Sequence, residues 1–207
     1  MRGLVSDLVA GASLSRGARV VDYGCADTPY ADLLPTDVAY VAADLGGNPG
    51  TDVVLAPDGT VPLPAGTIDL VLSTQVLEHV TEPAAYLLEC ARLLRPGGSL
   101  ILTTHGMMYR HPDPEDYWRW TSDGLVRVVT QAGLEVVELR GVLGLVAASL
   151  QLIQHAFLTH LPAVLRRPCM LLFQALIAGA DRLTSDERRR QDALVFGVRA
   201  VRPLSQA

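Results

Sequence analysis

Residues 18–27 read ARVVDYGCAD, a short β-branched run that ends at Asp22 and passes at once into a turn containing Gly24. Valine pairs of this kind favour a buried strand. A strand that ends in the pattern acid-x-Gly presents a carboxylate and backbone N–H groups at the edge of a parallel sheet where ligands bind. Gly24 lets the backbone come close to a ligand because it has no Cβ. Since ordinary tight turns share this composition, the rest of the chain has to decide between a ligand site and a plain turn.

Strand and helix signals alternate beyond this turn, as in a parallel sheet with helices on both faces. Pro83 begins one helix at a position where its missing N–H costs little, and Gly133 follows the end of another. The strands are expected at residues 18–22, 38–45, 52–55, 68–73, 99–104, 134–140 and 193–201, and the helices at 30–34, 83–94 and 121–132. The predicted fold is therefore α/β and Rossmann-like, a single domain over residues 1–207 with a helical insert at 141–191 between the last two strands.

Charge and cysteine content narrow the function classes. The chain has a net charge of −5, with 22 acidic against 17 basic side chains, all of the latter arginine. A nucleic-acid binder needs a basic stripe to neutralise phosphates, so nucleic acid is not expected as a partner. Cys25, Cys90 and Cys169 are odd in number and far apart, which indicates neither a disulfide framework nor a zinc site. Ser6 and Asp7 interrupt the first apolar run, so we expect no signal-peptide core and a cytoplasmic protein.

The segment between residues 141 and 191 is unusually apolar, even for a chain that is 49% hydrophobic. Residues 141–165 carry no acidic or arginine side chain. This uncharged segment is longer than the roughly 20 residues that a membrane span needs, but polar residues and Pro162 interrupt it. A second apolar segment, residues 169–180, is too short to span. We expect two helices that pack on the core or on a second copy, and hence a homodimer through 141–191. Peripheral contact with a membrane surface is the alternative.

Further segments support a ligand site at the first turn. Asp44 ends the second strand about 20 residues beyond the turn, the place of an acidic residue that bridges ribose hydroxyls. Residues 62–73 (PLPAGTIDLVLS), 76–80 (VLEHV) and 93–100 (LLRPGGSL) follow in order. Together these motifs resemble the class I S-adenosylmethionine-dependent methyltransferases, over roughly residues 18–140 and again at the terminal strand.

The resemblance implies the seven-stranded methyltransferase sheet and S-adenosylmethionine as cofactor. The family pattern assigns the turn and the end of the fourth strand to the methionine part, the end of the second strand to the ribose, and the residues beyond it to the adenine. The matching cofactor-binding residues are Asp22, Gly24 and Cys25 in the turn, Ser73 and Gln75 after the fourth strand, Asp44 for the ribose, and Leu45, Asp58 and Gly59 for the adenine. The chain departs from the family at Ala26 and Thr28, where glycine is usual, and we expect a differently shaped turn because threonine adopts positive φ only at a cost.

Three histidines are candidate catalytic bases. Methyl transfer from a sulfonium is an in-line displacement on an activated donor, so the protein mainly positions the reactants and removes a proton if the acceptor is a hydroxyl. Histidine suits that removal because its usual pKa is about 6.5. His79 follows the fourth strand, His105 ends the fifth, and His111 lies in the loop beyond it.

The loop at residues 105–121 is rich in aromatic and charged side chains. Aromatic faces beside carboxylates and guanidinium groups suit a carbohydrate, whose ring faces stack while its hydroxyls form hydrogen bonds. Its segment 116–121 (DYWRWT) is similar to a pattern in methyltransferases of polysaccharide and cell-envelope glycan pathways. Together with the absence of lysine, which indicates a GC-rich genome, this similarity suggests a mycobacterial-type sugar O-methyltransferase, such as one acting on methylmannose polysaccharide precursors. The alternative is an aromatic anchor that fastens the loop to the sheet. The predicted substrate-binding residues are Tyr109, Asp116, Tyr117, Trp118, Arg119 and Trp120.

Alternatives remain for the chemistry. The loop acids Asp113, Glu115 and Asp116 could hold Mg²⁺, which prefers oxygen ligands and would replace a histidine base by lowering the pKa of the acceptor hydroxyl. A nicotinamide-dependent oxidoreductase would share the fold, but it needs a G-x-G-x-x-G turn after the first strand. The sequence has no such turn there. A small-molecule or lipid methyltransferase at the membrane surface and a non-catalytic cofactor-binding partner subunit are the other candidates.

Overall fold

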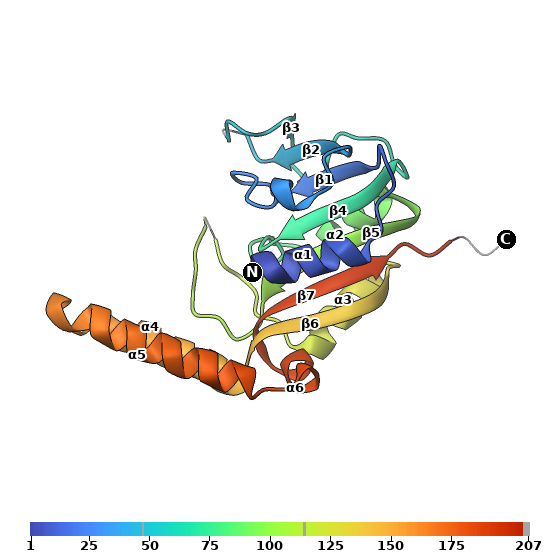
Figure 1. Ribbon diagram of the computed structural model, residues 1–207. Helices are drawn as coiled ribbons and strands as arrows, with labels where there is room; N and C mark the ends of the chain where they lie inside the picture. The colour runs from blue at the N-terminus through green and yellow to red at the C-terminus, as the bar shows by residue number, and fades with distance from the viewer. Residues whose placement is uncertain (47, 114, 205–207) are drawn as a thin grey trace.

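The computed structural model describes residues 1–204 except residues 47 and 114. Its centre is one seven-stranded sheet in the order β3-β2-β1-β4-β5-β7-β6, in which β7 runs antiparallel to both neighbours and the other pairs are parallel (Figure 1). The predicted α/β, Rossmann-like sheet of seven strands is thus confirmed. The strands are β1 (Arg19–Tyr23), β2 (Ala39–Asp44), β3 (Val53–Val54), β4 (Ile68–Thr74), β5 (Leu94–His105), β6 (Glu135–Gly144) and β7 (Ala193–Val201).

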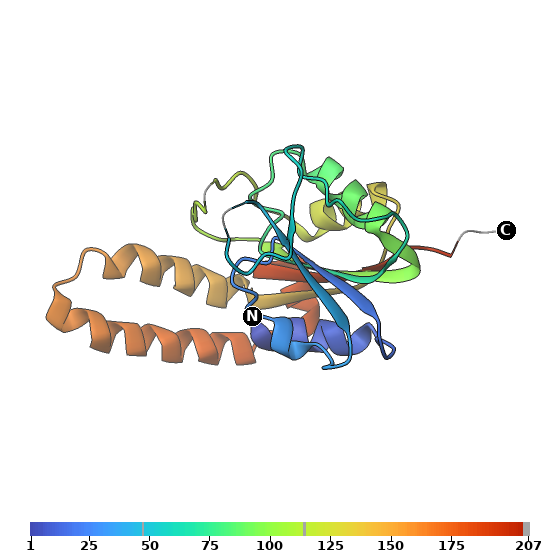
Figure 2. The ribbon, with the colours of Figure 1, turned by 90° about the horizontal axis from the view of Figure 1, so that it is seen from above.

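Helices cover both faces of the sheet, as the alternating pattern predicts (Figure 2). One face carries α2 and α3, and the other carries α1, a helix that the sequence pattern did not reveal. The apolar stripe of α1, which includes Leu4 and Leu8, packs on Val20 and Ile101. The helices are α1 (Arg2–Gly11), the 3-10 turn η1 (Ala31–Leu33), α2 (Pro83–Leu93), α3 (Ser122–Gln131), α4 (Leu145–Leu158), α5 (Ala163–Arg182) and α6 (Asp186–Gln191).

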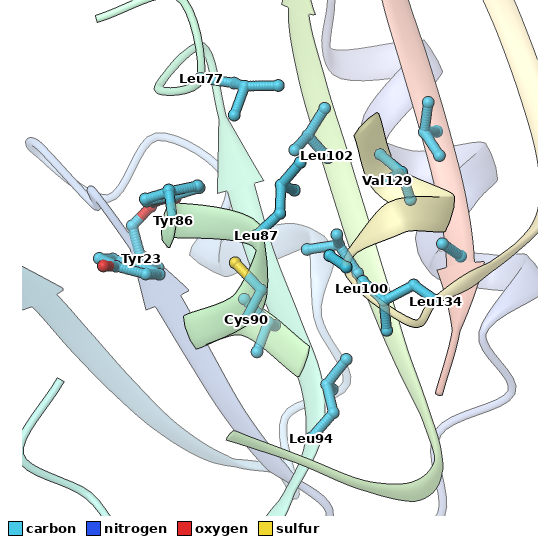
Figure 3. Close-up of a cluster of buried hydrophobic side chains, with 14 of the residues drawn as sticks. Tyr23, Leu77, Tyr86, Leu87, Cys90, Leu94, Leu100, Leu102, Val129 and Leu134 are labelled. Carbon is cyan, nitrogen blue, oxygen red and sulfur yellow. Dashed lines mark hydrogen bonds between the residues drawn. The ribbon is translucent and has the colours of Figure 1, made fainter. Parts of the chain in front are cut away.

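The main core lies between the sheet and the α2–α3 face (Figure 3). Leu87 and Cys90 of α2 are buried there, together with Leu100 and Leu102, which alternate on β5 so that the residue between them faces α1. Burial of one such leucine contributes on the order of 2 kcal/mol to the free energy of unfolding. This core holds the carboxyl ends of β1, β4 and β5 rigidly beside one another.

The insert between β6 and β7 takes an unexpected form. Residues 141–144 belong to β6, and α4 is only 14 residues long, so the uncharged segment 141–165 is not one continuous span. The apolar segment 169–180, by itself too short to span, lies within the 20-residue helix α5, and this longer helix is by length and composition long enough to cross a membrane. α4 and α5 form a hairpin that runs away from the sheet instead of packing along the core (Figures 1 and 2).

Candidate active site

A cavity of about 720 Å³ opens where β1, β2, β4 and β5 end. β1 has β2 on one side and β4 on the other, so the strand order reverses at this point. Such a switch point is where open α/β sheets bind ligands. One wall consists of the first turn and the end of β2, and the opposite wall is the loop beyond β5.

The turn after β1 keeps a left-handed shape at several positions. Gly24 has φ +80°, and a Cβ there would lie 2.5 Å from Val76 Cγ2, so glycine is required by conformation and by packing. Ala26 and Thr28 also have positive φ, 45° and 55°. The expected change of shape at these two residues is therefore wrong. The turn accepts a cost of roughly 1–2 kcal/mol per residue, because the Asp44 carboxylate accepts a 2.7 Å hydrogen bond from the Ala26 N–H.

Asp22 and Asp44 are the two predicted carboxylate acceptors for the cofactor: Asp44 lines the cavity, whereas Asp22 lies directly before the cavity-lining residues Tyr23 and Gly24. Asp22 is 1% exposed; its Oδ2 accepts from the Tyr40 hydroxyl at 2.7 Å, while its Oδ1 is buried without a partner. Burial raises the pKa of Asp22 to about 6. An unpaired buried carboxylate oxygen is costly and fits a cationic donor, such as the methionine ammonium group. Asp44 lines the cavity and, because each carboxylate oxygen accepts more than one hydrogen bond, can also accept from ribose hydroxyls.

The remaining cofactor predictions divide into two groups. Leu45, Gly59 and Gln75 line the cavity, and Leu45 is 59% exposed there, an uncovered apolar side chain that suits an adenine face. Three other predicted residues do not line the cavity, and their side chains have partners elsewhere. The carboxylate of Asp58 bonds its own turn at Thr60, the hydroxyl of Ser73 is buried against that of Tyr86, and the thiol of Cys25 is buried 3.8 Å from Asp44 Oδ2.

The three predicted histidines come together on the opposite wall. His79, His105 and His111 all line the cavity, and their ring centroids are 6.1–6.4 Å apart. They come from three segments: the residues after β4, the last residue of β5, and the loop beyond it. His79 Nδ1 bonds the carbonyl oxygen of Glu115, which leaves that nitrogen engaged.

His105 has the surroundings of a proton acceptor. It is 2% exposed, its Nε2 lies 3.2 Å from Glu78 Oε1, and its Nδ1 is buried without a partner. Glu78 is fully buried, and its other carboxylate oxygen accepts from the Thr104 hydroxyl at 2.8 Å. Glu78 Oε1 has no hydrogen-bond partner among the described residues, so the contact with Nε2 is electrostatic; a carboxylate at this distance favours the tautomer with the proton on Nε2, in which Nδ1 keeps its lone pair. Sequence reasoning missed Glu78 as a functional residue; its only signal was its place directly before His79.

Burial determines the protonation of this pair. It lowers the pKa of His105 to about 4, and the nearby Arg119 guanidinium acts in the same direction. Burial also raises the pKa of Glu78. His105 is therefore neutral at neutral pH and able to accept a proton.

The loop beyond β5 uses its aromatic residues differently from the sugar-binding prediction. Of the six predicted substrate-binding residues, only Tyr109 lines the cavity. Trp118 donates from its ring N–H to the carbonyl oxygen of Val80 at 2.8 Å, and its ring stacks on that of Trp120, 5.9 Å away. The backbone N–H groups of Tyr117 and Trp120 bond carbonyl oxygens of Glu78 and His105. The alternative interpretation, an anchor that fastens the loop to the sheet, is confirmed for these residues.

Arg119 and Asp116 brace the same loop rather than face the cavity. Two guanidinium nitrogens of Arg119 bond the two carboxylate oxygens of Asp116 at 2.5 and 2.6 Å. The same side chain donates to the carbonyl oxygens of Met108 and Tyr109 at 2.8 and 2.6 Å. Arg119 holds the pKa of Asp116 well below its usual range. Met108 and Tyr109, two of the cavity-lining residues of the loop, are thus held in place by the Arg119 side chain.

Replacing Arg119 with methionine is expected to lower the free energy of unfolding by about 2 kcal/mol, because the buried Asp116 carboxylate loses charged hydrogen bonds. The acceptor KM should rise, since Met108 and Tyr109 lose their support, while S-adenosylmethionine affinity stays unchanged. Denaturant unfolding, steady-state kinetics and calorimetry measure the three quantities. Arg110→Met, an exposed arginine of the same loop, is the matched control; an equal loss in both variants would contradict the bracing role.

The donor set at the loop bears on the magnesium alternative. Asp113 and Glu115 line the cavity, but the carboxylate of Asp116 is occupied by Arg119 and by the His111 N–H. Within the described part of the chain, no group of three or more carboxylate, histidine or cysteine side chains is arranged to hold a metal ion. The predicted three-acid set is therefore not assembled.

The strand order, the turn and the two strand-end acids define a class I methyltransferase fold. A family model described as a methyltransferase domain matches residues 1–139. A probable S-adenosylmethionine-dependent methyltransferase of Mycolicibacterium smegmatis is 30% identical over 142 residues, covering 61% of this chain and 55% of that protein. A ubiquinone biosynthesis O-methyltransferase of Dinoroseobacter shibae is 30% identical over 161 residues, covering 61% and 63%. The chain thus spans little more than half the length of these two relatives.

Solved structures agree on the fold. A SAM-dependent methyltransferase from Aquifex aeolicus superposes with a TM-score of 0.58 at 15% identity, covering 96% of this chain and 89% of that one. The [4+2]-cyclase SpnF superposes with a TM-score of 0.59 at 20% identity, covering 97% and 80%. The chain belongs to the methyltransferase-domain family, and S-adenosylmethionine is the cofactor that this membership implies. The same fold in a cyclase means that the reaction has to be argued from the site.

Proposed function

We propose that the protein is an O-methyltransferase that transfers a methyl group from S-adenosylmethionine to a hydroxyl of a small acceptor, with His105 as the general base. The observation that carries this proposal is the buried His105 imidazole on the cavity wall, held beside Glu78 with an unpartnered Nδ1. A base is needed for a hydroxyl acceptor because its oxygen must lose a proton as it forms the bond to carbon.

The residues on the two walls would divide the work. S-adenosylmethionine, when bound, supplies a methyl group on a positively charged sulfur, which leaves as a neutral thioether. Asp22 and Asp44 hold the donor side through charge and hydrogen bonds. His105 Nδ1 accepts the hydroxyl proton while the acceptor oxygen bonds to the methyl carbon, and the nearby Glu78 carboxylate stabilises the resulting imidazolium. Positioning of the two reactants accounts for most of the rate.

The first candidate acceptor is a sugar. Tyr109 contributes an aromatic ring to the cavity wall, one face of which stacks on His155, and Asp113 and Glu115 offer carboxylates that accept hydrogen bonds from hydroxyls. The tryptophans that favoured a sugar lie elsewhere in the loop, so this proposal depends on these three residues. The second candidate is a phenolic hydroxyl, which the apolar cavity residues Val76 and Met108 favour, as does the similarity to ubiquinone biosynthesis O-methyltransferases.

A two-stage experiment tests the proposal. Calorimetry first measures S-adenosylmethionine binding, and then methyl-labelled cofactor is incubated with mono- and disaccharides and with catechols, with magnesium or with a chelator. Label on a sugar supports the first acceptor class, and label on catechols alone supports the second. Loss of transfer with the chelator would contradict a histidine base. Tight cofactor binding with no methyl transfer to any acceptor would contradict the proposed O-methyltransferase activity and favour a non-catalytic partner subunit.

A further inference from the structure

The α4–α5 hairpin exposes an unusual amount of apolar surface. Its buried residues lie mostly at its base, where Ala147, Ala148 and Ile177 pack near the sheet. Farther out the two helices contact each other, and Phe157 lies 6.2 Å from Phe173 between ring centroids. Exposing so much apolar surface to water is energetically unfavourable, so this surface is expected to be covered by a partner. The large exposed apolar side chains of the two helices are Leu145, Val146, Ile153, Phe157, Val164, Leu165, Met170, Leu171, Leu172 and Leu176.

The charge of the hairpin is one-sided. From Gly141 to Ala180 there is no aspartate or glutamate, although the whole chain has 22 of them. The only formal charges in this segment are those of Arg166 and Arg167, in the first turn of α5 and so at the end of the hairpin farthest from the sheet. An apolar arm with a positive tip is complementary to a negatively charged lipid surface.

The polar groups inside the hairpin satisfy each other. Gln174 donates to the side-chain oxygen of the buried Gln154 at 2.8 Å, which links α5 to α4. This bond lets the two helices stay paired in an apolar medium, where an unpaired amide would be costly.

The lengths of the two helices decide how deeply the hairpin can enter. α5 has 20 residues, about 30 Å, which matches the hydrocarbon core of a bilayer. α4 has 14 residues, about 21 Å, and both ends of the hairpin are tied to the sheet through β6 and α6. A crossing by α5 would need a return path longer than α4 provides. The hairpin therefore fits the interfacial layer of a membrane and not a full span.

We propose that the α4–α5 hairpin docks the protein onto the surface of a membrane that contains anionic lipids. The apolar side chains enter the acyl boundary, and Arg166 and Arg167 reach the lipid phosphates. A second copy of the chain is a poorer occupant, because the exposed apolar residues are distributed over both helices and residues 141–180 include no acid to pair with Arg166 and Arg167. Docking would place the cavity beside the lipid, since Tyr109 of its wall stacks on His155 of α4 with ring centroids 3.7 Å apart.

Co-sedimentation of the full chain with vesicles tests the docking. One vesicle set contains equal parts phosphatidylglycerol and phosphatidylcholine, and the other contains phosphatidylcholine alone. We expect the protein to pellet with the anionic set. Arg166→Glu with Arg167→Glu should weaken this binding at least about tenfold, and Leu171→Gln with Leu172→Gln should do the same by removing apolar contact.

Matched controls lie outside the arm. Arg188→Glu with Arg190→Glu reverses two exposed charges at its base, and Leu88→Gln changes a leucine on α2 that is 55% exposed; neither should alter binding. Calorimetry with S-adenosylmethionine shows that each variant is folded, independently of any methyl-transfer activity. The proposal is overturned if the wild type stays in the supernatant with both vesicle sets, if the controls lose binding equally, or if light scattering without lipid finds a dimer that the leucine variants dissociate.

Discussion

Replacing His105 with alanine is expected to slow methyl transfer about 10²- to 10⁴-fold, the usual contribution of a general base, while S-adenosylmethionine affinity changes by less than about twofold. The reason is that His105 lines the acceptor wall and has an unpartnered Nδ1, whereas Asp44 and Leu45 lie on the opposite wall. Single-turnover kinetics on the acceptor found by screening, with calorimetry for the cofactor, separates the two effects.

The other histidines are the matched controls. His79→Ala and His111→Ala remove rings of the same cluster but should cost less, because Nδ1 of His79 is engaged by a carbonyl and His111 is exposed. Full activity of the His105 variant together with an inactive His79 variant would assign the base to His79 instead.

The pH dependence of the rate provides a second measurement of the same assignment. Because burial lowers the pKa of His105 to about 4, the rate at saturating S-adenosylmethionine should be flat near neutrality and fall as the pH drops through about 4. Glu78→Gln should shift this fall, since the neighbouring carboxylate is lost, whereas a purely structural role for Glu78 would leave its position unchanged. An unshifted wild-type fall near pH 6.5 would contradict the buried base.

Replacing Asp22 with asparagine is expected to weaken S-adenosylmethionine binding roughly 10- to 100-fold and at the same time to stabilise the cofactor-free protein by about 1–2 kcal/mol at pH 7. The carboxylate is buried with Oδ1 unpaired, so its ionised form lowers stability until a cationic donor arrives. Asparagine removes the charge but leaves one amide N–H without a partner, which offsets part of the gain.

The stability difference between the Asp22 variant and the wild type should depend on pH, because it arises from the ionisation of the buried carboxylate. The pKa of Asp22 is raised in the folded state to about 6 from 3.8, so the folded chain binds the proton more tightly than the unfolded chain. Protonation of Asp22 therefore stabilises the folded chain; this stabilisation is complete below pH 3.8 and is lost as the pH rises through about 6. The advantage of the variant should therefore vanish near pH 4 and be complete above pH 7.

Denaturant unfolding at several pH values, with calorimetry for the cofactor, measures both parts of the Asp22 prediction. Asp58→Asn is the control, because that carboxylate is exposed and bonds its own turn outside the cavity; its cofactor affinity should change by less than about twofold. An Asp22 variant that binds the cofactor as tightly as the wild type would remove Asp22 from the site.

The sequence by itself determined the seven strands and the donor side of the site. Hydrophobic alternation and helix stop signals are local, and carboxyl ends of parallel strands meet at one edge, so Asp22, Asp44 and His105 could be assigned to that edge from the order of elements alone. The same argument brought His79 and His111 to the acceptor side, and the structure places all three histidines on the cavity wall.

Only the tertiary structure decided what each loop and insert residue faces. Trp118 and Arg119 turn away from the cavity because distant carbonyl oxygens and a carboxylate bind them, and Thr28 keeps a left-handed backbone because the rest of the turn is held in place. Glu78 can act on the proton of the candidate base only because the fold buries it beside His105 of β5. The apolar insert became an exposed arm because its helices pair with each other rather than with the sheet. Such outcomes depend on contacts between residues far apart in the chain, which local patterns do not encode.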